Sequence, residues 1–529
     1  MPLSSTASLF GDDPSRRVEL AQTLEERQST ELVIALVGPI GSGVTTTGEM
    51  LSDILRSRYG YQVPGIIKLS KIIRTEAFRV GGQPAGRERL AVYIDDMQTI
   101  GNRLREKFGP RYLAEKAIEQ ITRQRQSVGG YRDSDGRRLV QPVRAAYIID
   151  SIKNIEEYQL LRQVYGQSLL LFGVFAPDEL RRERLVTNGT DDKAVDRIFQ
   201  RDEGEDQTFG QKTRDTFGEA DFFICNDTRR STLHDKLERY LHILFGTGIH
   251  TPTYAETAMF EAEAAALNSA CLSRQVGAAL ISDKGELIGI GWNDVPRAGG
   301  GLYREDHSHS LDPATGKIED HDFRCFKWQG GHCQNERRRR RIIDEILLES
   351  KHKGLLTSPA QENRLRAILV KSGVNAVIEY SRSIHAEMEA ILSVAREGKH
   401  SLVGARLFTT VYPCHNCARH IVAAGISEVV YIQPYRKSLA IELHGDAISE
   451  TGSSGAGGRE KVVFRQYDGV APQNFQRLFK PVGPRKHNAV YTRPNPATAL
   501  PLFRIPLDGF ADYEDKIIAD LEQKERAPL

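Results

Sequence analysis

The chain has 529 residues, of which 40% are hydrophobic and 27% are charged, and its formal net charge at pH 7 is +2. This length predicts about two to four domains, and the near-neutral charge gives no global reason to bind nucleic acid or an anionic membrane. No apolar run approaches the roughly eighteen residues of a transmembrane helix. Six cysteines are too few for a disulfide framework, which favours metal binding or burial. We therefore expect a cytoplasmic protein without a membrane partner.

The chain begins with a polar stretch, residues 1–30, whose lack of a sustained hydrophobic period predicts a mobile arm. This stretch has no apolar core followed by a small-residue cleavage site, so we expect no signal peptide. Residues 31–247 then alternate strand-like and helical segments, which predicts an α/β domain with a parallel sheet and helical crossovers. The expected strands are 32–37, 145–149, 169–175 and 221–224.

A glycine-rich segment follows the first expected strand and opens a helix. It reads Gly38-Pro-Ile-Gly41-Ser42-Gly43-Val44-Thr45-Thr46. It matches the phosphate-loop pattern G-x-x-x-x-G-K-[ST], except that Val44 stands in place of the lysine. Backbone amides of such a loop cradle phosphates, and Thr45 or Thr46, with Asp150 after the next strand, is a candidate Mg²⁺ site. We predict a P-loop kinase-like domain in which these residues bind a nucleotide.

The missing lysine limits what this loop is expected to do. Without that charge on the β- and γ-phosphates, phosphoryl transfer should suffer most. Candidate replacements are Lys68, Lys71 and Arg74, and the arginine-bearing segment 179–185 resembles the lid helix of nucleoside monophosphate kinases. A decayed kinase fold kept as a scaffold is the alternative.

A break rich in glycine and proline, at residues 246–252, separates this domain from a second one. We expect the second domain over residues 251–470, interrupted by a charged insertion at about 297–376, and a tail over 471–529. The expected helices of the second domain are 254–270, 386–396 and 414–424, and the expected strands are 277–282, 287–291, 406–411 and 428–432.

The second domain carries a metal-ligand pattern. His385 and Glu387 stand two residues apart, and Cys414 and Cys417 follow in a Pro-Cys-His-Asn-Cys run. Two cysteines at this spacing face one point from the first turn of a helix, and with one histidine they form a catalytic zinc set with an open position. Such a zinc acidifies water, and Glu387 is placed to move protons. The pattern is the signature of zinc deaminases; a structural zinc knuckle is the alternative.

Further segments extend this signature to a family. Cys271–Ile281, Gly291–Pro296 and Thr410–Ala418, together with the zinc pattern, resemble the deoxycytidylate deaminase family. The resemblance implies a cytidine deaminase-like three-layer α/β/α domain, a cytosine nucleotide substrate contacted by Asn293 and Ala386, and a homo-oligomer, commonly a hexamer. Such enzymes respond to deoxynucleoside triphosphates.

A P-loop domain in front of such a deaminase resembles the bacterial anti-phage dCTP deaminases. That resemblance implies zinc-dependent conversion of dCTP and dCMP to dUTP and dUMP, which depletes deoxycytidine nucleotides during infection, and restraint by an RNA, a protein or a nucleotide effector. The alternative is a deaminase of single-stranded nucleic acid, which the near-neutral charge disfavours.

Two weaker signals lie in and near the insertion. Cys325, His332 and Cys333 are in it, and Cys271 begins the catalytic core. Some deoxycytidylate deaminases hold a second, structural zinc from such regions, while ordinary thiols are the alternative. The arginine run 337–341 is typical of a solvated helix face or a subunit contact.

Overall fold

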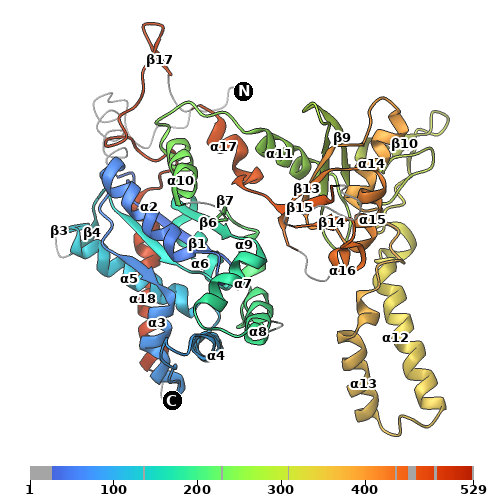
Figure 1. Ribbon diagram of the computed structural model, residues 1–529, viewed down its shortest axis with the longest axis horizontal. Coiled ribbons are helices and arrows are strands. Elements are labelled where there is room, and N and C mark those ends of the chain that lie inside the picture. Colours follow the sequence, from blue (N-terminus) through green and yellow to red (C-terminus); the bar gives the residue numbers. More distant parts are fainter. Residues whose placement is uncertain are drawn as a thin grey trace, which may run out of the picture. The chain divides into compact units, whose positions relative to one another are not determined.

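The computed structural model describes residues 27–134, 137–205, 207–227, 230–307, 309–434, 438–450, 460–481 and 485–526. The chain divides into two compact units (Figure 1). Unit 1 comprises Met1–Pro252 and Asp468–Leu529, and unit 2 comprises Thr253–Tyr467. Unit 2 is therefore inserted into the sequence of unit 1, and the residues expected to form a tail behind the second domain belong to unit 1 instead.

Unit 1 is built on a six-stranded sheet in the order β16-β7-β6-β1-β5-β2. The strands are β1 (Leu32–Val37), β2 (Ile66–Lys68), β5 (Ala146–Asp150), β6 (Leu169–Phe175), β7 (Phe222–Cys225) and β16 (Gly469–Val470). All are parallel to their neighbours except β16, which pairs antiparallel with β7. The central strands are buried throughout, as parallel strands covered on both faces must be. The expected parallel α/β sheet is confirmed.

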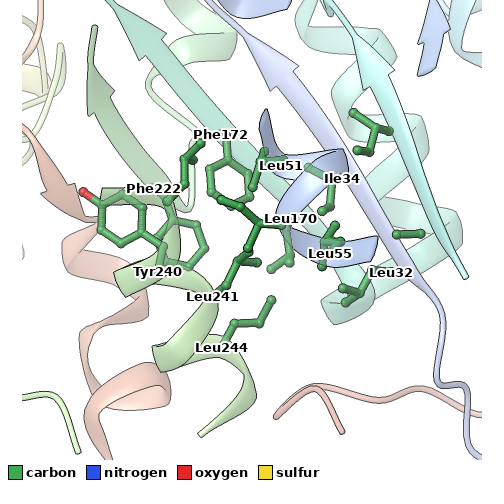
Figure 2. Close-up of a cluster of buried hydrophobic side chains, with 14 of the residues drawn as sticks. Leu32, Ile34, Leu51, Leu55, Leu170, Phe172, Phe222, Tyr240, Leu241 and Leu244 are labelled. Carbon is green, nitrogen blue, oxygen red and sulfur yellow. The ribbon is translucent and has the colours of Figure 1, made fainter. Parts of the chain in front are cut away.

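Helices connect and cover this sheet, and their bounds are α2 (Val44–Tyr59), α3 (Leu69–Glu76), α4 (Leu90–Phe108), α5 (Tyr112–Ser127), α6 (Ile155–Tyr165), α7 (Asp178–Thr187), α8 (Asp192–Glu203), α9 (Thr213–Phe217), α10 (Arg230–Phe245), α17 (Phe475–Phe479) and α18 (Leu507–Arg526). Two short hairpins accompany them: β3 (Tyr131–Ser134) with β4 (Arg137–Val140), and β17 (Lys486–His487) with β18 (Val490–Tyr491). Figure 2 shows the core of the unit, where side chains of α2 and α10 pack on the sheet. Its labelled members include Leu51, Leu55, Leu170, Phe172, Phe222, Leu241 and Leu244.

The C-terminal helix α18 is fixed to unit 1 by a buried ionic network. Arg125 of α5 donates to Glu31 at 2.9 Å and to Glu514 of α18 at 3.0 Å, and all three side chains are buried. Nearby, the Ser29 amide donates to the Ile505 carbonyl at 2.9 Å, and Ser29 is buried. The expected arm over residues 1–30 is therefore too long at its end, because 27–30 pack into unit 1; residues 1–26 lie outside the described residues.

Unit 2 is also built on a six-stranded sheet, in the order β14-β15-β13-β12-β8-β9. The strands are β8 (Gly277–Ile281), β9 (Leu287–Trp292), β12 (Arg406–Val411), β13 (Glu428–Gln433), β14 (Ile448–Ser449) and β15 (Val462–Gln466), and the helices α11 (Tyr254–Ala266), α14 (Ala386–Glu397), α15 (His415–Ala423) and α16 (Ala440–His444). The first two strands are antiparallel, and β12, β13, β15 and β14 run parallel.

Glycines show how helices cover both faces of this sheet. A Cβ on Gly277 would lie 1.9 Å from the Ala262 carbonyl of α11, and one on Gly291 would lie 2.3 Å from the Ala386 carbonyl at the start of α14. Gly277 pairs with Trp292 and shares its face, so the preceding Gly291 points to the opposite face. Helices α11 and α14 therefore lie on opposite faces, which is the expected three-layer arrangement.

The insertion between β9 and α14 folds mainly as a helical hairpin of α12 (Gln334–His352) and α13 (Pro359–Lys371), preceded by the hairpin of β10 (His309–Leu311) and β11 (Ile318–Asp320). Only Ile343 and Leu347 of the described α12 and α13 side chains are buried. The arginine run lies on the first turns of α12. In the described part of the chain, no helix combines the length and apolar character needed to cross a membrane.

Candidate zinc centre and phosphate loop

Three side chains of unit 2 converge at the starts of two helices. His385 immediately precedes α14, Cys414 immediately precedes α15, and Cys417 lies in the first turn of α15. The Nδ1 atom of His385 is 3.3 Å from Sγ of Cys414 and 3.4 Å from Sγ of Cys417. Their ligand atoms all lie within 4.8 Å of one another. The structure thus brings together the three residues that the sequence predicts as metal ligands.

The chemistry of this cluster fits zinc. Two cysteine sulfurs and one histidine nitrogen are ligands that tetrahedral Zn²⁺ prefers, and three protein ligands leave one position for a reactant. Glu387, 4% exposed, lies beside them and its carboxylate accepts a hydrogen bond from the Cys417 thiol at 3.4 Å. The carboxylate is therefore next to the predicted metal position without belonging to the three-residue cluster.

Hydrogen bonding and burial shift the pKa values of the side chains in this cluster. The hydrogen bond from Cys417 lowers the pKa of Cys414 to about 4, and the same hydrogen bond raises the pKa of Cys417. Hydrogen bonding to Cys414 raises the pKa of His385 to about 9. Burial raises the pKa of the Glu387 carboxyl.

Asp294, which sequence reasoning missed, ties the ligand histidine to the rest of the unit. The Ile384 amide, next to His385, donates to the Asp294 carbonyl at 2.9 Å. The buried Asp294 carboxylate accepts from the amides of Ala270 at 2.9 Å and Val295 at 2.7 Å. An aspartate two residues beyond β9 was the available signal, but its partners are distant in sequence.

The two residues expected at the substrate occupy different surroundings. Asn293 accepts from the Val276 amide and donates to the Arg274 carbonyl, both at 2.7 Å, so its side chain holds the loop before β8. Ala386 is fully buried and its carbonyl faces Gly291. Contact of either residue with a nucleotide stays a prediction.

The cysteines considered for a second zinc lie near one another. Burial raises the pKa of the Cys325 thiol, and the neighbouring thiols of Cys271 and Cys333 raise it further. Their sulfurs do not gather within 4.8 Å, whereas the predicted zinc ligands and the surface group of His234, Asp235 and Glu238 do, among described residues. His332 is exposed.

The phosphate loop of unit 1 joins β1 to α2. Gly41 and Gly43 adopt positive φ of 84° and 85°, a region that favours glycine. Thr45 donates to the Asp150 carboxylate at 2.8 Å, and burial raises the pKa of Asp150. The predicted partners of a magnesium ion are therefore adjacent. Val44 is 8% exposed and belongs to the hydrophobic core.

Side chains from distant segments hold the carbonyl groups of this loop. Lys153 donates to Gly38 at 2.6 Å, Arg181 to Ile40 at 2.9 Å, Arg184 to Gly41 at 2.9 Å, and Asn226 to Ser42 at 2.8 Å. With its carbonyls bound from outside, the loop is fixed in shape without the lysine. Lys153 and Asn226 were missed, because nothing near them in the sequence points to the loop.

The three residues predicted to replace the missing lysine differ in their surroundings, and one of them lies near the phosphate loop. Lys68 lies at the end of β2 in register with Asp150, and its Nζ is 3.8 Å from Glu49 of α2. Arg74 stacks on the ring of Tyr93 at 5.3 Å. Lys71 is exposed. Lys68 is thus the candidate beside the predicted magnesium ligands.

Comparison with known proteins finds relatives of two kinds. Residues 343–433 match the family described as the cytidine and deoxycytidylate deaminase zinc-binding region. The deoxycytidylate deaminase of Enterobacteria phage T4 is 28% identical over 173 residues, which cover 32% of this chain and 72% of that protein. A UPF0200 protein of Methanosarcina acetivorans is 25% identical over 212 residues, which cover 40% of this chain and 95% of that protein.

Among solved structures, the apo dCMP deaminase of cyanophage S-TIM5 covers 41% of this chain and 100% of its own, at 17% identity and a TM-score of 0.21. The match to a shikimate kinase from Acinetobacter baumannii in complex with shikimate covers 42% of this chain and 97% of the kinase chain, at 14% identity and a TM-score of 0.24. With the family match and the architecture of the two sheets, the chain is a fusion of a P-loop unit and a deaminase-type unit that carries a zinc-binding region.

Proposed function

We propose that the chain is a zinc-dependent hydrolytic deaminase that converts dCTP and dCMP to dUTP and dUMP with release of ammonia. The single observation that carries this proposal is the convergence of His385, Cys414 and Cys417 beside the buried carboxylate of Glu387. This combination of three ligands and one non-ligand acid is what hydrolysis of an amino-pyrimidine requires.

In the proposed reaction, His385, Cys414 and Cys417 hold the metal and Glu387 moves protons. Zinc, when bound there, supplies the Lewis acidity that makes a water molecule nucleophilic at neutral pH. Glu387 accepts a proton from the attacking water and passes it to ring nitrogen N3. It then carries a proton from the added hydroxyl to the exocyclic amine, the C4–N bond breaks, and ammonia leaves.

The alternative substrate is cytosine in single-stranded nucleic acid, which the same chemistry deaminates. The formal net charge of +2 does not favour a polyanion. The likeness to deoxycytidylate deaminases supports the free nucleotide, with Asn293 and Ala386 as proposed contacts.

For unit 1 we propose nucleotide binding that regulates the deaminase rather than phosphoryl transfer. The glycine geometry, the externally held loop carbonyls and the Thr45–Asp150 pair support binding, with Mg²⁺ as the accompanying ion. Val44 removes the cation that transfer needs.

Three further parts of the proposal rest on the resemblance to anti-phage dCTP deaminases. We propose that depletion of deoxycytidine nucleotides is a defence against phage in the cytoplasm. We also propose a homo-oligomer, a hexamer by that resemblance, and restraint by an RNA, a protein or a nucleotide effector before infection.

A second, structural zinc is the last element of the proposal. Cys271, Cys325 and Cys333 would provide three thiolates. The effect of the Cys271 and Cys333 thiols on the pKa of Cys325 supports this, and the three sulfurs would have to move closer together to share one ion. Two zinc ions per chain by elemental analysis, reduced to one in Cys325→Ser, are expected; one ion in the parent protein would remove this element.

The experiment that tests the main proposal is ammonia release from purified, zinc-loaded protein. The substrates are dCTP, dCMP, deoxycytidine and a single-stranded cytosine oligonucleotide. Turnover of dCTP and dCMP alone is expected. Turnover of the oligonucleotide alone would establish the alternative, and turnover of none by protein freed of bound RNA, protein and nucleotide would contradict both.

A further inference from the structure

A buried side-chain amide on α4 lacks a hydrogen-bond partner among the residues that the structure describes. Gln98 is 6% exposed, and neither its Nε2 nor its Oε1 has a hydrogen-bond partner among the described residues. An amide left unpaired in the interior is destabilising on both its donor and its acceptor side. Such a group in a folded protein requires a reason, and a ligand that completes the hydrogen bonds is one.

Helical spacing shows which way Gln98 faces. It lies on the same stripe of α4 as Ala91, Ile94 and Arg105, at intervals of three, four and seven residues. Ala91 and Ile94 pack against a cluster of α7 and α8 that also contacts Ile40 of the phosphate loop. Arg105 donates to Glu157 of α6 at 2.7 Å. Along this stripe, Gln98 lies between residues that pack on the α7–α8 cluster, as Ile40 of the phosphate loop does, and a residue that pairs with the first turn of α6.

A second buried polar group, at the end of β5, also lacks a hydrogen-bond partner among the described residues. Ser151 directly follows β5 and Asp150, and its buried hydroxyl finds no hydrogen-bond partner in the described part of the chain. Asp150 itself accepts from Thr45 of the loop. Ligands of α/β proteins bind at the carboxyl ends of parallel strands, where these groups are found.

We propose that unit 1 recognises the base of a nucleotide through Gln98, while the phosphates of that nucleotide lie against the loop 38–45. The proposal rests on the nucleotide-binding role proposed for unit 1, and it adds the residue that reads the base. A primary amide offers a donor next to an acceptor. Nucleobases present the complementary pair on their edges, which is why glutamine and asparagine side chains read bases.

The test uses the full chain with Glu387→Ala, so that no nucleotide is deaminated. The melting temperature and the hydrogen exchange of residues 90–108 are measured with dCTP, dUTP and ATP, each with Mg²⁺. At least one nucleotide is expected to raise the melting temperature and slow exchange in α4. In Gln98→Leu, the ligand-free melting temperature should rise by roughly 2–4 °C, because an unpaired buried amide is removed. The affinity for that nucleotide should fall about tenfold or more.

A matched control is Gln163→Leu, the same change at an exposed position of α6. It should leave the nucleotide response unchanged. If none of the three nucleotides slows exchange in α4 of the parent protein, both the nucleotide-binding role of unit 1 and this inference are overturned, whatever the melting temperature does through unit 2. If a nucleotide protects α4 equally in Gln98→Leu, only base recognition by Gln98 is overturned.

Discussion

The two units hold their candidate sites in opposite ways. In unit 2, the three predicted ligands lie at the starts of α14 and α15, and two of them are three residues apart in sequence. In unit 1, the phosphate loop is one continuous segment, but the side chains that fix it come from separate segments, including Lys153, Arg184 and Asn226.

This difference predicts how strongly each site responds to the loss of a single group. The zinc cluster depends on a few groups that a metal links directly, so losing the metal or the acid should have large effects confined to unit 2. The phosphate loop is held by several separate hydrogen bonds, each of which contributes modestly. Single changes there should therefore have smaller effects.

The largest expected effect follows removal of zinc with a chelator. Turnover should be lost and unit 2 should melt at a lower temperature, because metal binding contributes folding free energy of several kcal/mol, up to about 10 kcal/mol. Calorimetry of the full chain with and without EDTA, with metal content measured in parallel, checks this. Unit 1 serves as the internal control, and added Zn²⁺ should restore activity. Full turnover in metal-free protein would contradict the zinc assignment.

The next largest effect is expected for Glu387→Ala. Loss of the proton-moving carboxylate should lower turnover of dCTP about a hundredfold to ten-thousandfold, while zinc stays bound because glutamate is not among the three clustered ligands. Ammonia release and elemental analysis measure the two quantities. The matched control is Glu397→Ala at the exposed end of the same helix. Near-normal turnover in Glu387→Ala would exclude the proposed role.

The same contrast explains how much could be predicted from the sequence. In unit 2, chemistry and local structure coincide: the expected helix 386–396 is α14, the expected helix 414–424 contains α15, and the ligands lie at their starts. Asp294 escaped prediction because its partners, Ala270 and Ile384, meet it only through folding.

Unit 1 was predictable as an α/β sheet but not in its details. Strands β2 and β16 have three and two residues, too few for a hydrophobic period to register. Strand β16 adds to the edge of β7 after the whole of unit 2, so the return of residues 468–529 to unit 1 had no local signal. The buried pair of Arg125 and Glu514 that fixes this return joins residues far apart in sequence.

A smaller effect is expected for Gly43→Ala in the phosphate loop. The positive φ alone costs about 1–2 kcal/mol for a residue with a Cβ. The added carbon would also lie 2.1 Å from Nδ2 of Asn226, so Asn226 must move and release the Ser42 carbonyl. Urea unfolding and ATP binding by the full chain measure both consequences. Gly81→Ala is the matched control, since Gly81 has φ of 61° and nothing within 4 Å of a Cβ. Equal losses of ATP affinity in both variants would mean that Asn226 has no part in holding the loop.

The smallest effect is expected for Arg184→Met. Arg184 donates to the carbonyls of Gly41 and Asn226, both at 2.9 Å, so it fixes the loop and brings a positive charge to it. Losing these bonds should weaken ATP binding about tenfold and leave deamination chemistry at saturating substrate intact. Arg182→Met is the control, because Arg182 lies on the same helix and pairs with Asp192 at 3.2 Å. If both variants bind ATP as the parent does, the loop does not depend on Arg184 alone. The loop of unit 1 would then tolerate single changes even better than expected, in contrast to the zinc site of unit 2. If Arg184→Met loses binding a thousandfold, a single arginine has taken over the role of the missing lysine, and the contrast fails.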